Sequence, residues 1–375
     1  MHVTVSPALQ FPLLIVVLLI LLGGRAGAES RSRKTQNIFL ITTDGLRWQE
    51  IFSGAEAALM NKKDGGVKDT NGLRRDFLRD TPEERRAVLF PFIWGTLAKQ
   101  GQLWGNQNRR STVRVTNGRN FSYPGYSEFL TGIVDASIDS NDKRPNPNTN
   151  VFEWLNLQRE FHGKVAATVS WGVIPWVLNV ERSHLPVWSA FELPPGITPI
   201  PMPATFRDLL ANSTPIWADV SLDTYTAFSA REIVRKENPR AFYIAYGETD
   251  DWAHEGRYDL YLRAAHNFDR NVGELWTLVQ SMPAYRNCTT FVLATDHGRG
   301  SGPVAWKNHS RAIAESSSIW LAVMGPDTPP LGERADTANT TQSQIAATVA
   351  GFLGRDYCEQ FPKAAKSIAE LLPKR

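Results

Sequence analysis

Cysteine is scarce in this chain, and its scarcity limits both the redox chemistry and the metal chemistry that the protein can use. Only Cys288 and Cys358 occur among the 375 residues. An exported chain could join this pair in one disulfide, but a disulfide-rich scaffold is excluded. A thiolate-rich metal site is excluded as well, because it would need more cysteines than the chain contains.

An excess of charge of either sign is also missing. Lys and Arg number 41 against 38 Asp and Glu, which leaves a formal net charge of +3. No basic run is interleaved with aromatic residues, so no nucleic-acid surface is evident. Internal repeats and low-complexity segments are absent from the sequence too. The oligomeric state is not indicated by any of these features.

Long apolar runs are rare, and the clearest one lies near the start of the chain. Residues 11–22 are apolar except for Pro12, and the small residues Ala26 and Ala28 follow. The run is too short to span a bilayer comfortably, so residues 1–28 are predicted to be an export signal removed near Ala28. The mature protein would then be periplasmic or extracellular and keep no stable membrane span. Because the leader lacks Lys and Arg before its apolar run, an uncleaved N-terminal anchor stays open as an alternative.

Three apolar, β-prone runs are each followed by side chains that can bind a metal ion. The runs are residues 38–43, 241–246 and 291–295. The side chains that follow are Asp44 after the first run, Asp250 and His254 after the second, and Asp296 and His297 after the third. Ligands of open α/β sheets bind outside the carboxyl ends of the strands, so these side chains are expected to share one crevice. A single Asp-His pair more often orients a surface histidine, but its recurrence favours a metal site.

Two further residues complete the candidate site. His309 lies twelve residues beyond His297, in a loop that contains Gly, Trp and Lys. Ser122 stands just before Pro124 and ahead of Gly132, which places it at the start of a short helix. A helix start can seat an anion, although a serine there is equally compatible with a simple cap. Beside metal ligands, Ser122 becomes a candidate nucleophile, because metal coordination lowers the pKa of a hydroxyl group.

The alternation of strands and helices predicts the fold class. Helices are expected over residues 82–100, 151–162, 219–236, 258–281 and 342–353, and a surface loop over residues 53–80. Strands that alternate with helices indicate an α/β domain whose mostly parallel central sheet is flanked by helices on both faces. We assign this domain to residues 36–375, with an aromatic and proline-rich insertion at about 171–217. Tryptophans 171, 176 and 188 in the insertion either line a pocket or pack a loop onto the domain.

The candidate ligands are numerous enough for two metal ions. They are Asp44, Ser122, Asp250, His254, Asp296, His297 and His309. Nitrogen and oxygen ligands without thiolates suit Zn²⁺ best, with Mn²⁺ as the alternative. Two such ions, spaced about 4 Å apart, can stabilise the attacking and the leaving oxygen of a displacement at phosphorus.

The order of these motifs resembles the alkaline phosphatase superfamily. Within it, the sequence is most similar to the branch of nucleotide pyrophosphatase/phosphodiesterases, phosphopentomutases and sulfatases. The resemblance implies an alkaline phosphatase-like fold over residues 38–353. It also implies that one ion is held by Asp44, Ser122, Asp296 and His297, and the other by Asp250, His254 and His309. Ser122 would then form a covalent phosphoryl-serine intermediate that water hydrolyses.

The stretch around Ser122 departs from the patterns of that branch. Gly125 stands where phosphodiesterases carry a phosphate-binding asparagine, and Tyr126 stands where sulfatases carry an arginine. The second departure argues against a formylglycine sulfatase. Substrate contacts are therefore assigned to nearby polar residues: Arg119, Lys307 and Asn117. Cationic groups here would neutralise charge that develops on a phosphate oxygen.

These observations predict an exported, metal-dependent hydrolase that acts on a small-molecule phosphate ester, either a monoester or a diester. A cell-envelope phosphotransferase and a sulfatase-like hydrolase stay open as alternatives. A third alternative is a secreted binding protein with the same fold and no catalytic activity.

Overall fold

The computed structural model describes residues 1–4 and 33–373, and residues 33–373 belong to one compact unit. Most of the predicted export signal, residues 1–28, lies outside the described residues. Among the residues that are described, no helix is both long enough and apolar enough to cross a membrane.

An eight-stranded sheet forms the centre of this unit. Its strands are, in spatial order, β10 (Gly332–Glu333), β2 (Gly101–Trp104), β9 (Leu321–Met324), β7 (Thr289–Ala294), β1 (Asn37–Thr43), β6 (Ala241–Tyr246), β4 (Val165–Val169) and β5 (Val187–Ser189). Among these eight strands only β9 runs against the others, pairing antiparallel with both β2 and β7. A small second sheet contains β11 (Thr340–Thr341), β3 (Val113–Arg114) and β8 (Ser318–Ile319). The prediction of a mostly parallel central sheet is confirmed.

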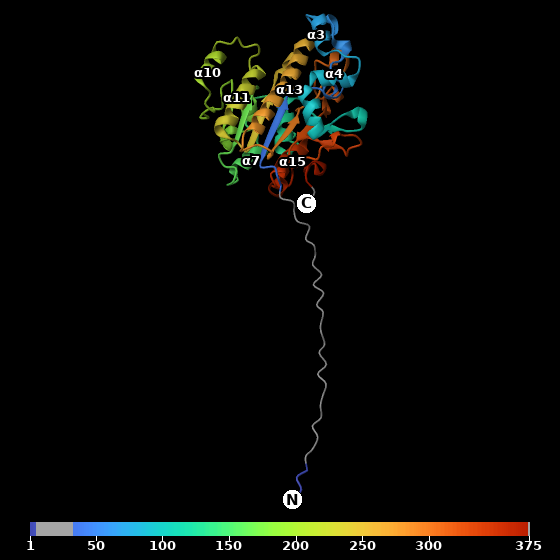
Figure 1. Cartoon of the computed structure of the whole chain (residues 1–375). Helices are drawn as coiled ribbons and strands as arrows, with labels where there is room; N and C mark the ends of the chain where they lie inside the picture. Colours follow the sequence, from blue (N-terminus) through green and yellow to red (C-terminus); the bar gives the residue numbers. More distant parts are fainter. Residues whose placement is uncertain (5–32, 374–375) are drawn as a thin grey trace. The chain divides into compact units, whose positions relative to one another are not determined.

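Helices cover both faces of the central sheet (Figure 1). One face packs against α6 (Ser122–Thr131), α7 (Val151–Leu157), α8 (Ile174–Val177), α9 (Val180–Ser183), α15 (Ile345–Phe352) and α16 (Tyr357–Gln360). The other packs against α1 (Trp48–Ser53), α3 (Thr70–Phe77), a π-helical turn at Ile93–Leu97, α10 (Ala204–Ala211), α11 (Asp223–Glu237) and α13 (Tyr258–Ser281). The remaining helices include α2 (Lys62–Gly65), α4 (Pro82–Leu89), α5 (Ala98–Gln100), α12 (Glu248–His254) and α14 (Gly302–Ala305).

The central strands are mostly apolar and do not alternate with polar residues, because both of their faces are buried. In β1, Ile38 and Leu40 contribute to one core, whereas Phe39 and Ile41 contribute to the other. Strands with two buried faces read as continuous apolar runs, which is why the sequence showed no alternation there. The strand predicted at residues 241–246 and the helix predicted at 258–281 have the predicted bounds in the structure.

Two predictions of local structure are wrong. The helix predicted over residues 82–100 ends at Leu89 and resumes two residues later, because Phe90 precedes Pro91 and adopts a non-helical conformation. The segment 53–80 is not an open surface loop, since it contains α2 and α3. The side chains of Leu73 and Phe77 lie four residues apart in α3 and are both buried.

The segment 171–217, predicted as an insertion, contributes a strand to the central sheet. Its strand β5 extends the central sheet by pairing in parallel with β4. Trp171 and Trp188 are buried, which agrees with packing against the domain. Cys288 and Cys358 are both free thiols in the structure, so the disulfide that the sequence allowed is not formed.

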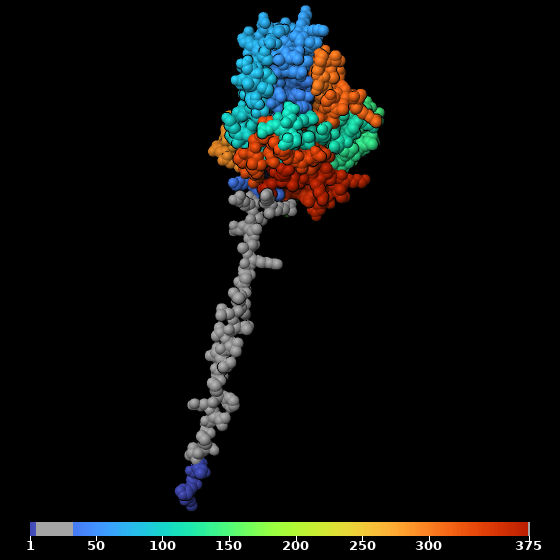
Figure 2. All heavy atoms as spheres, turned by 90° about the vertical axis from the view of Figure 1, so that its right-hand side faces the viewer, coloured from blue at the N-terminus to red at the C-terminus, as the bar shows by residue number. Residues whose placement is uncertain are grey.

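Segments far apart in the sequence meet around the start of α6. Figure 2 shows the C-terminal segment in red beside the segment around residues 100–130 in teal. In agreement with this view, β11 and β8 pair with the two sides of β3. Within the same region Glu128 of α6, which is 1% exposed, accepts hydrogen bonds from backbone and side-chain donors of Thr116 and Asn117. Glu128 therefore fixes the strand-to-helix connection that leads to Ser122.

Replacing Glu128 is expected to destabilise this connection. Glu128→Ala leaves several donors without an acceptor, at a cost of roughly 1–3 kcal/mol for each buried group. Thermal unfolding should show a clear decrease in Tm for Glu128→Ala and a smaller one for Glu128→Gln, which keeps one acceptor oxygen. Equal Tm values for the wild type and Glu128→Ala would contradict this role.

Candidate metal centre

Three neighbouring strands deliver the predicted ligands to one edge of the sheet. β1 lies between β6 and β7 and is in parallel register with both. Asp44 follows β1, Asp296 and His297 follow β7, and α12 begins two residues after β6 and carries Asp250 and His254. Because the carboxyl ends of parallel strands coincide, residues more than 200 positions apart become neighbours.

The first group of ligands surrounds the imidazole of His297. Its Nε2 lies 3.2 Å from Asp44 Oδ1 and 3.3 Å from Asp296 Oδ2. Ser122 Oγ lies 3.3 Å from the same nitrogen. The other ring nitrogen fixes the orientation of this imidazole, since His297 Nδ1 is 3.0 Å from the carbonyl oxygen of Gly298. This contact leaves Nε2 facing the carboxylates, as a metal-binding histidine requires.

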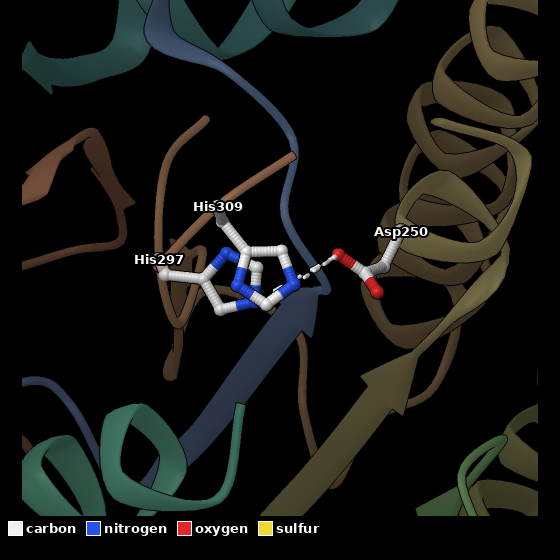
Figure 3. A group of neighbouring side chains, drawn as sticks. All are labelled: Asp250, His297 and His309. Atoms are coloured by element: carbon white, nitrogen blue, oxygen red, sulfur yellow. Dashed lines mark ion pairs between the residues drawn. The ribbon is translucent and has the colours of Figure 1, made fainter. Parts of the chain in front are cut away.

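The second group surrounds Asp250. Asp250 Oδ2 lies 3.2 Å from His254 Nε2, and Asp250 Oδ1 lies 3.6 Å from His309 Nε2. The two imidazole nitrogens are 2.9 Å apart. Figure 3 shows Asp250 facing the stacked rings of His297 and His309, whose centroids are 3.9 Å apart. The two groups are therefore adjacent.

The donor atoms match what a divalent ion needs. The ligand atoms of Asp44, Asp296 and His297 lie within 4.8 Å of one another, as do those of Asp250, His297 and His309. Asp44 Oδ1 and Asp296 Oδ2 are buried and have no hydrogen-bond partner among the described residues. Buried carboxylate oxygens without donors are costly, and a cation between them removes that cost. Nitrogen and oxygen ligands of this kind suit Zn²⁺ or Mn²⁺.

The electrostatics of the first group also indicate a missing positive charge. Burial, followed by the charge of Asp250, raises the pKa of Asp44 well above 3.8. Burial and the charge of Asp44 raise the pKa of Asp296 well above the same ordinary value. Burial and neighbouring His297 lower the pKa of His309 to about 2, so its imidazole is neutral and available as a ligand.

Arg299 is a functional candidate that was missed when only the sequence was considered. It is 1% exposed, and its guanidinium contacts Asp250 Oδ1, the Asp250 carbonyl oxygen at 2.9 Å and the Lys307 carbonyl oxygen at 2.6 Å. Burial alone would raise the pKa of Asp250, but the charge of the adjacent Arg299 guanidinium outweighs it and holds that pKa well below 3.8. Arg299 therefore ties α12 to the loop that carries His309. Its position two residues after His297 was the only signal in the sequence.

Tyr126 and Gly125 have structural roles that explain their presence. The Tyr126 hydroxyl donates to Asp44 Oδ2 at 3.0 Å, so this tyrosine orients a predicted ligand. A Cβ atom at Gly125 would lie 2.4 Å from the carbonyl oxygen of Asp296. No asparagine could occupy position 125 without moving the backbone next to the ligands.

Ser122 is the first residue of α6, as predicted, and its side chain does not cap the helix. The anion-binding site that we expected at this helix start has few free backbone N–H donors. The Tyr123 amide donates to Asn141 Oδ1 at 2.9 Å, and Pro124 has no amide hydrogen. The beginning of α6 therefore keeps few free donors for an anion.

Arg119 and Asn117, two of the three predicted substrate contacts, have other partners. Asn117 Nδ2 donates to Glu128 Oε2 at 2.9 Å, and Arg119 Nη2 donates to the Ala136 carbonyl oxygen at 3.2 Å. The side chain of Lys307 lies along Gly256, just after α12. Their roles toward a substrate stay predictions.

Comparison with known proteins identifies the fold. No family model and no curated protein sequence matches the chain. Among solved structures, the alkaline phosphatase PafA matches with a TM-score of 0.54 and 12% identity over 91% of this chain and 99% of that one. A protein in the alkaline phosphatase superfamily from Vibrio parahaemolyticus matches with a TM-score of 0.50 and 13% identity, covering 90% of this chain and 70% of the other. BT1596, a 2-O GAG sulfatase, matches with a TM-score of 0.53 and 12% identity, covering 89% and 73%.

The class defined by these findings is an α/β protein with metal-ligating side chains at its strand ends. More particularly, the chain has the fold of the alkaline phosphatase superfamily. The resemblance inferred from the motif order is confirmed, and so is the predicted fold class. At these low identities the comparison concerns the fold, so the chemistry has to be argued from the site.

Metal removal is expected to make stability depend on pH. The pKa values of Asp44 and Asp296 are raised, so the folded metal-free protein binds more protons than the unfolded chain above pH 3.8. Its stability should therefore fall as pH rises through the raised pKa values. The lowered pKa of Asp250 acts in the opposite sense, but its effect is lost only below pH 3.8.

This dependence can be measured as Tm at pH 5 and pH 8.5, after chelation and after addition of zinc. Zinc at about 100 times its Kd should add about 2.7 kcal/mol, and the gain in Tm should be larger at pH 8.5. Asp44→Asn should reduce that gain. An equal gain at both pH values would contradict the assignment.

Arg299→Gln is expected to weaken metal binding, because it frees Asp250 and the loop that carries His309. Loss of a residue that orients a ligand lowers metal affinity roughly 10- to 100-fold. Metal content after dialysis against a chelator series would measure the effect. Arg231→Gln is a suitable control, since Arg231 forms only a surface ion pair with Glu274. Equal metal retention by both variants would exclude the role of Arg299.

Proposed function

We propose that this protein is an exported hydrolase of small-molecule phosphate esters that uses two divalent metal ions and Ser122 as its nucleophile. The observation that carries the proposal is the position of Ser122 Oγ, 3.3 Å from His297 Nε2 and next to the two groups of ligands. A hydroxyl group at the start of a helix has no structural need for six metal-competent neighbours, whereas a metal-activated nucleophile does.

The ligands divide between the two ions according to their positions. Asp44, Ser122, Asp296 and His297 would hold one ion, and Asp250, His254 and His309 the other. Zn²⁺ suits this donor set best, with Mn²⁺ as the alternative. When bound, such ions lower the pKa of the serine hydroxyl and neutralise the charge on the phosphoryl oxygens.

The residues of the chain then perform a two-step displacement. Ser122 Oγ gives up its proton to solvent and attacks phosphorus, the bond from phosphorus to the ester oxygen breaks, and the leaving alkoxide takes a proton from water to become the alcohol. Water next attacks the phosphoryl-serine, releases phosphate or a phosphate monoester, and returns a proton to Ser122. Tyr126 and Arg299 hold Asp44 and Asp250 in place during both steps. Lys307 and Arg119 are the proposed cationic contacts with the substrate.

Two related reactions would use the same nucleophile. A cell-envelope phosphotransferase would pass the phosphoryl group from Ser122 to an alcohol instead of water. A sulfatase-like hydrolase would need a sulfate site, and here Tyr126 replaces the expected arginine and is hydrogen-bonded to Asp44. We therefore place phosphate ester hydrolysis ahead of both.

Activity assays with purified protein test the proposal. Para-nitrophenyl phosphate, bis-para-nitrophenyl phosphate and para-nitrophenyl sulfate should be compared, with metal content measured on the same samples. We expect two equivalents of metal and turnover of a phosphate ester. Ser122→Ala should lower kcat roughly 10³-fold or more, as loss of a nucleophile does elsewhere.

Ser137→Ala is the matched control, because Ser137 is exposed and bonded only to Asp135. Turnover that requires an added alcohol would identify a transferase. Turnover of the sulfate ester alone would identify a sulfatase. Protein without bound metal and without turnover would exclude the proposed function and leave a binding protein.

A further inference from the structure

A phosphoryl group attacked by Ser122 needs hydrogen-bond donors, and most of the expected donors are not available. Position 125 can only be glycine, because a side chain there would collide with Asp296. The start of α6 lacks free amides at positions 123 and 124. Asn117 is engaged by Glu128, and Arg119 uses one guanidinium nitrogen for the Ala136 carbonyl oxygen, which leaves its other donors for the substrate contact proposed above. An uncharged donor close to Ser122 would share this task with Arg119.

Asn120 lies two residues before Ser122 and is held firmly by its backbone. Its amide donates to Asn117 Oδ1 at 3.1 Å, and its carbonyl oxygen lies 3.1 Å from His309 Nδ1. The backbone adopts φ 55°, in the left-handed region where asparagine is tolerated better than most residues. Asn120 thus lies beside the ring of one predicted metal ligand and immediately before the nucleophile.

The side chain of Asn120 has no partner in the part of the chain that the structure describes. The residue is only 7% exposed, and its buried Oδ1 receives no hydrogen bond from the described residues. Its amide nitrogen donates to none of them either. A buried Oδ1 without a donor indicates that this side chain is held for a ligand or a catalytic role, because native structures otherwise satisfy buried polar atoms. The neighbouring Asn117 and Asn141 side chains, by contrast, are both used.

We propose that the Asn120 side-chain amide donates a hydrogen bond to a phosphoryl oxygen of the substrate while Ser122 attacks phosphorus. This inference rests on the proposed function and names the donor that takes the place of the asparagine missing at position 125. The backbone of this donor residue is held next to His309, because its carbonyl oxygen lies 3.1 Å from His309 Nδ1. A donor fixed in this way stabilises the charge that develops on the oxygen in the transition state.

Asn120→Gly is the sharpest test, because glycine accepts the left-handed backbone and keeps the carbonyl contact with His309. We expect a decrease in kcat/KM of about 10²- to 10³-fold, as for loss of one oxyanion donor. The affinity for inorganic phosphate, measured by calorimetry, should fall about 10- to 100-fold. Metal content should stay at the wild-type value.

Asn238→Gly is the matched control, since Asn238 has φ 49° and lies on the surface at the end of α11. It makes the same substitution in the same backbone conformation away from the site. Its kcat/KM, phosphate affinity and metal content should equal those of the wild type.

Asn120→Asp separates contact with the substrate from contact with a metal. A carboxylate facing the phosphoryl group should lower phosphate affinity further than glycine does. Higher metal affinity in Asn120→Asp, together with metal loss in Asn120→Gly, would overturn the proposal and make Asn120 a ligand. Unchanged kcat/KM and phosphate affinity in Asn120→Gly would overturn it as well. Wild-type protein without metal or turnover would instead exclude the underlying hydrolase function.

Discussion

The repulsion among three carboxylates gathered at one edge of the sheet is the constraint on which the rest of this site depends. Parallel strands bring Asp44, Asp250 and Asp296 together; Asp44 and Asp296 are buried, and the Asp250 side chain is 15% exposed. Burial and mutual repulsion raise the pKa values of Asp44 and Asp296, whereas Asp250 is in direct contact with the buried cation of Arg299. Such a cluster is stable with bound protons or with bound metal ions, and at neutral pH the metal ions are the better solution.

The surrounding structure holds this cluster in one arrangement. Tyr126 fixes Asp44 from α6, the Gly45 amide donates to Asp296, and Arg299 fixes Asp250. Each contact orients a ligand while leaving one oxygen free, which is what metal binding requires. Gly125 lets the same helix approach the backbone of Asp296 closely. Ser122 and the candidate ligands are therefore held by the same set of packed elements.

The sequence predicted the fold class well and proposed candidate ligands that the structure places at one edge of the sheet, but it did not predict the contacts around them. Apolar runs that end in Asp or His are local signals, so Asp44, Asp250 and Asp296 could be identified without a structure. Arg299 could not, because its role comes from contacts with Asp250 and Lys307 that only folding creates. The break after Leu89 was missed although Pro91 signals it, and the helix α3 was missed because its apolar residues are few.

By itself, the sequence determined the alternation of strands and helices and the chemical types of the candidate metal ligands, because both depend only on short, local segments of the chain. The tertiary structure alone decided which donors remain free for a substrate. Asn117 and Asn120 are three residues apart and chemically identical, yet Glu128 binds the first, and no described residue binds the side chain of the second. That difference arises because α6 brings Glu128 next to the segment before Ser122. Glu128 and Asn117 are distant in the sequence, so they come into contact only when the helix has folded.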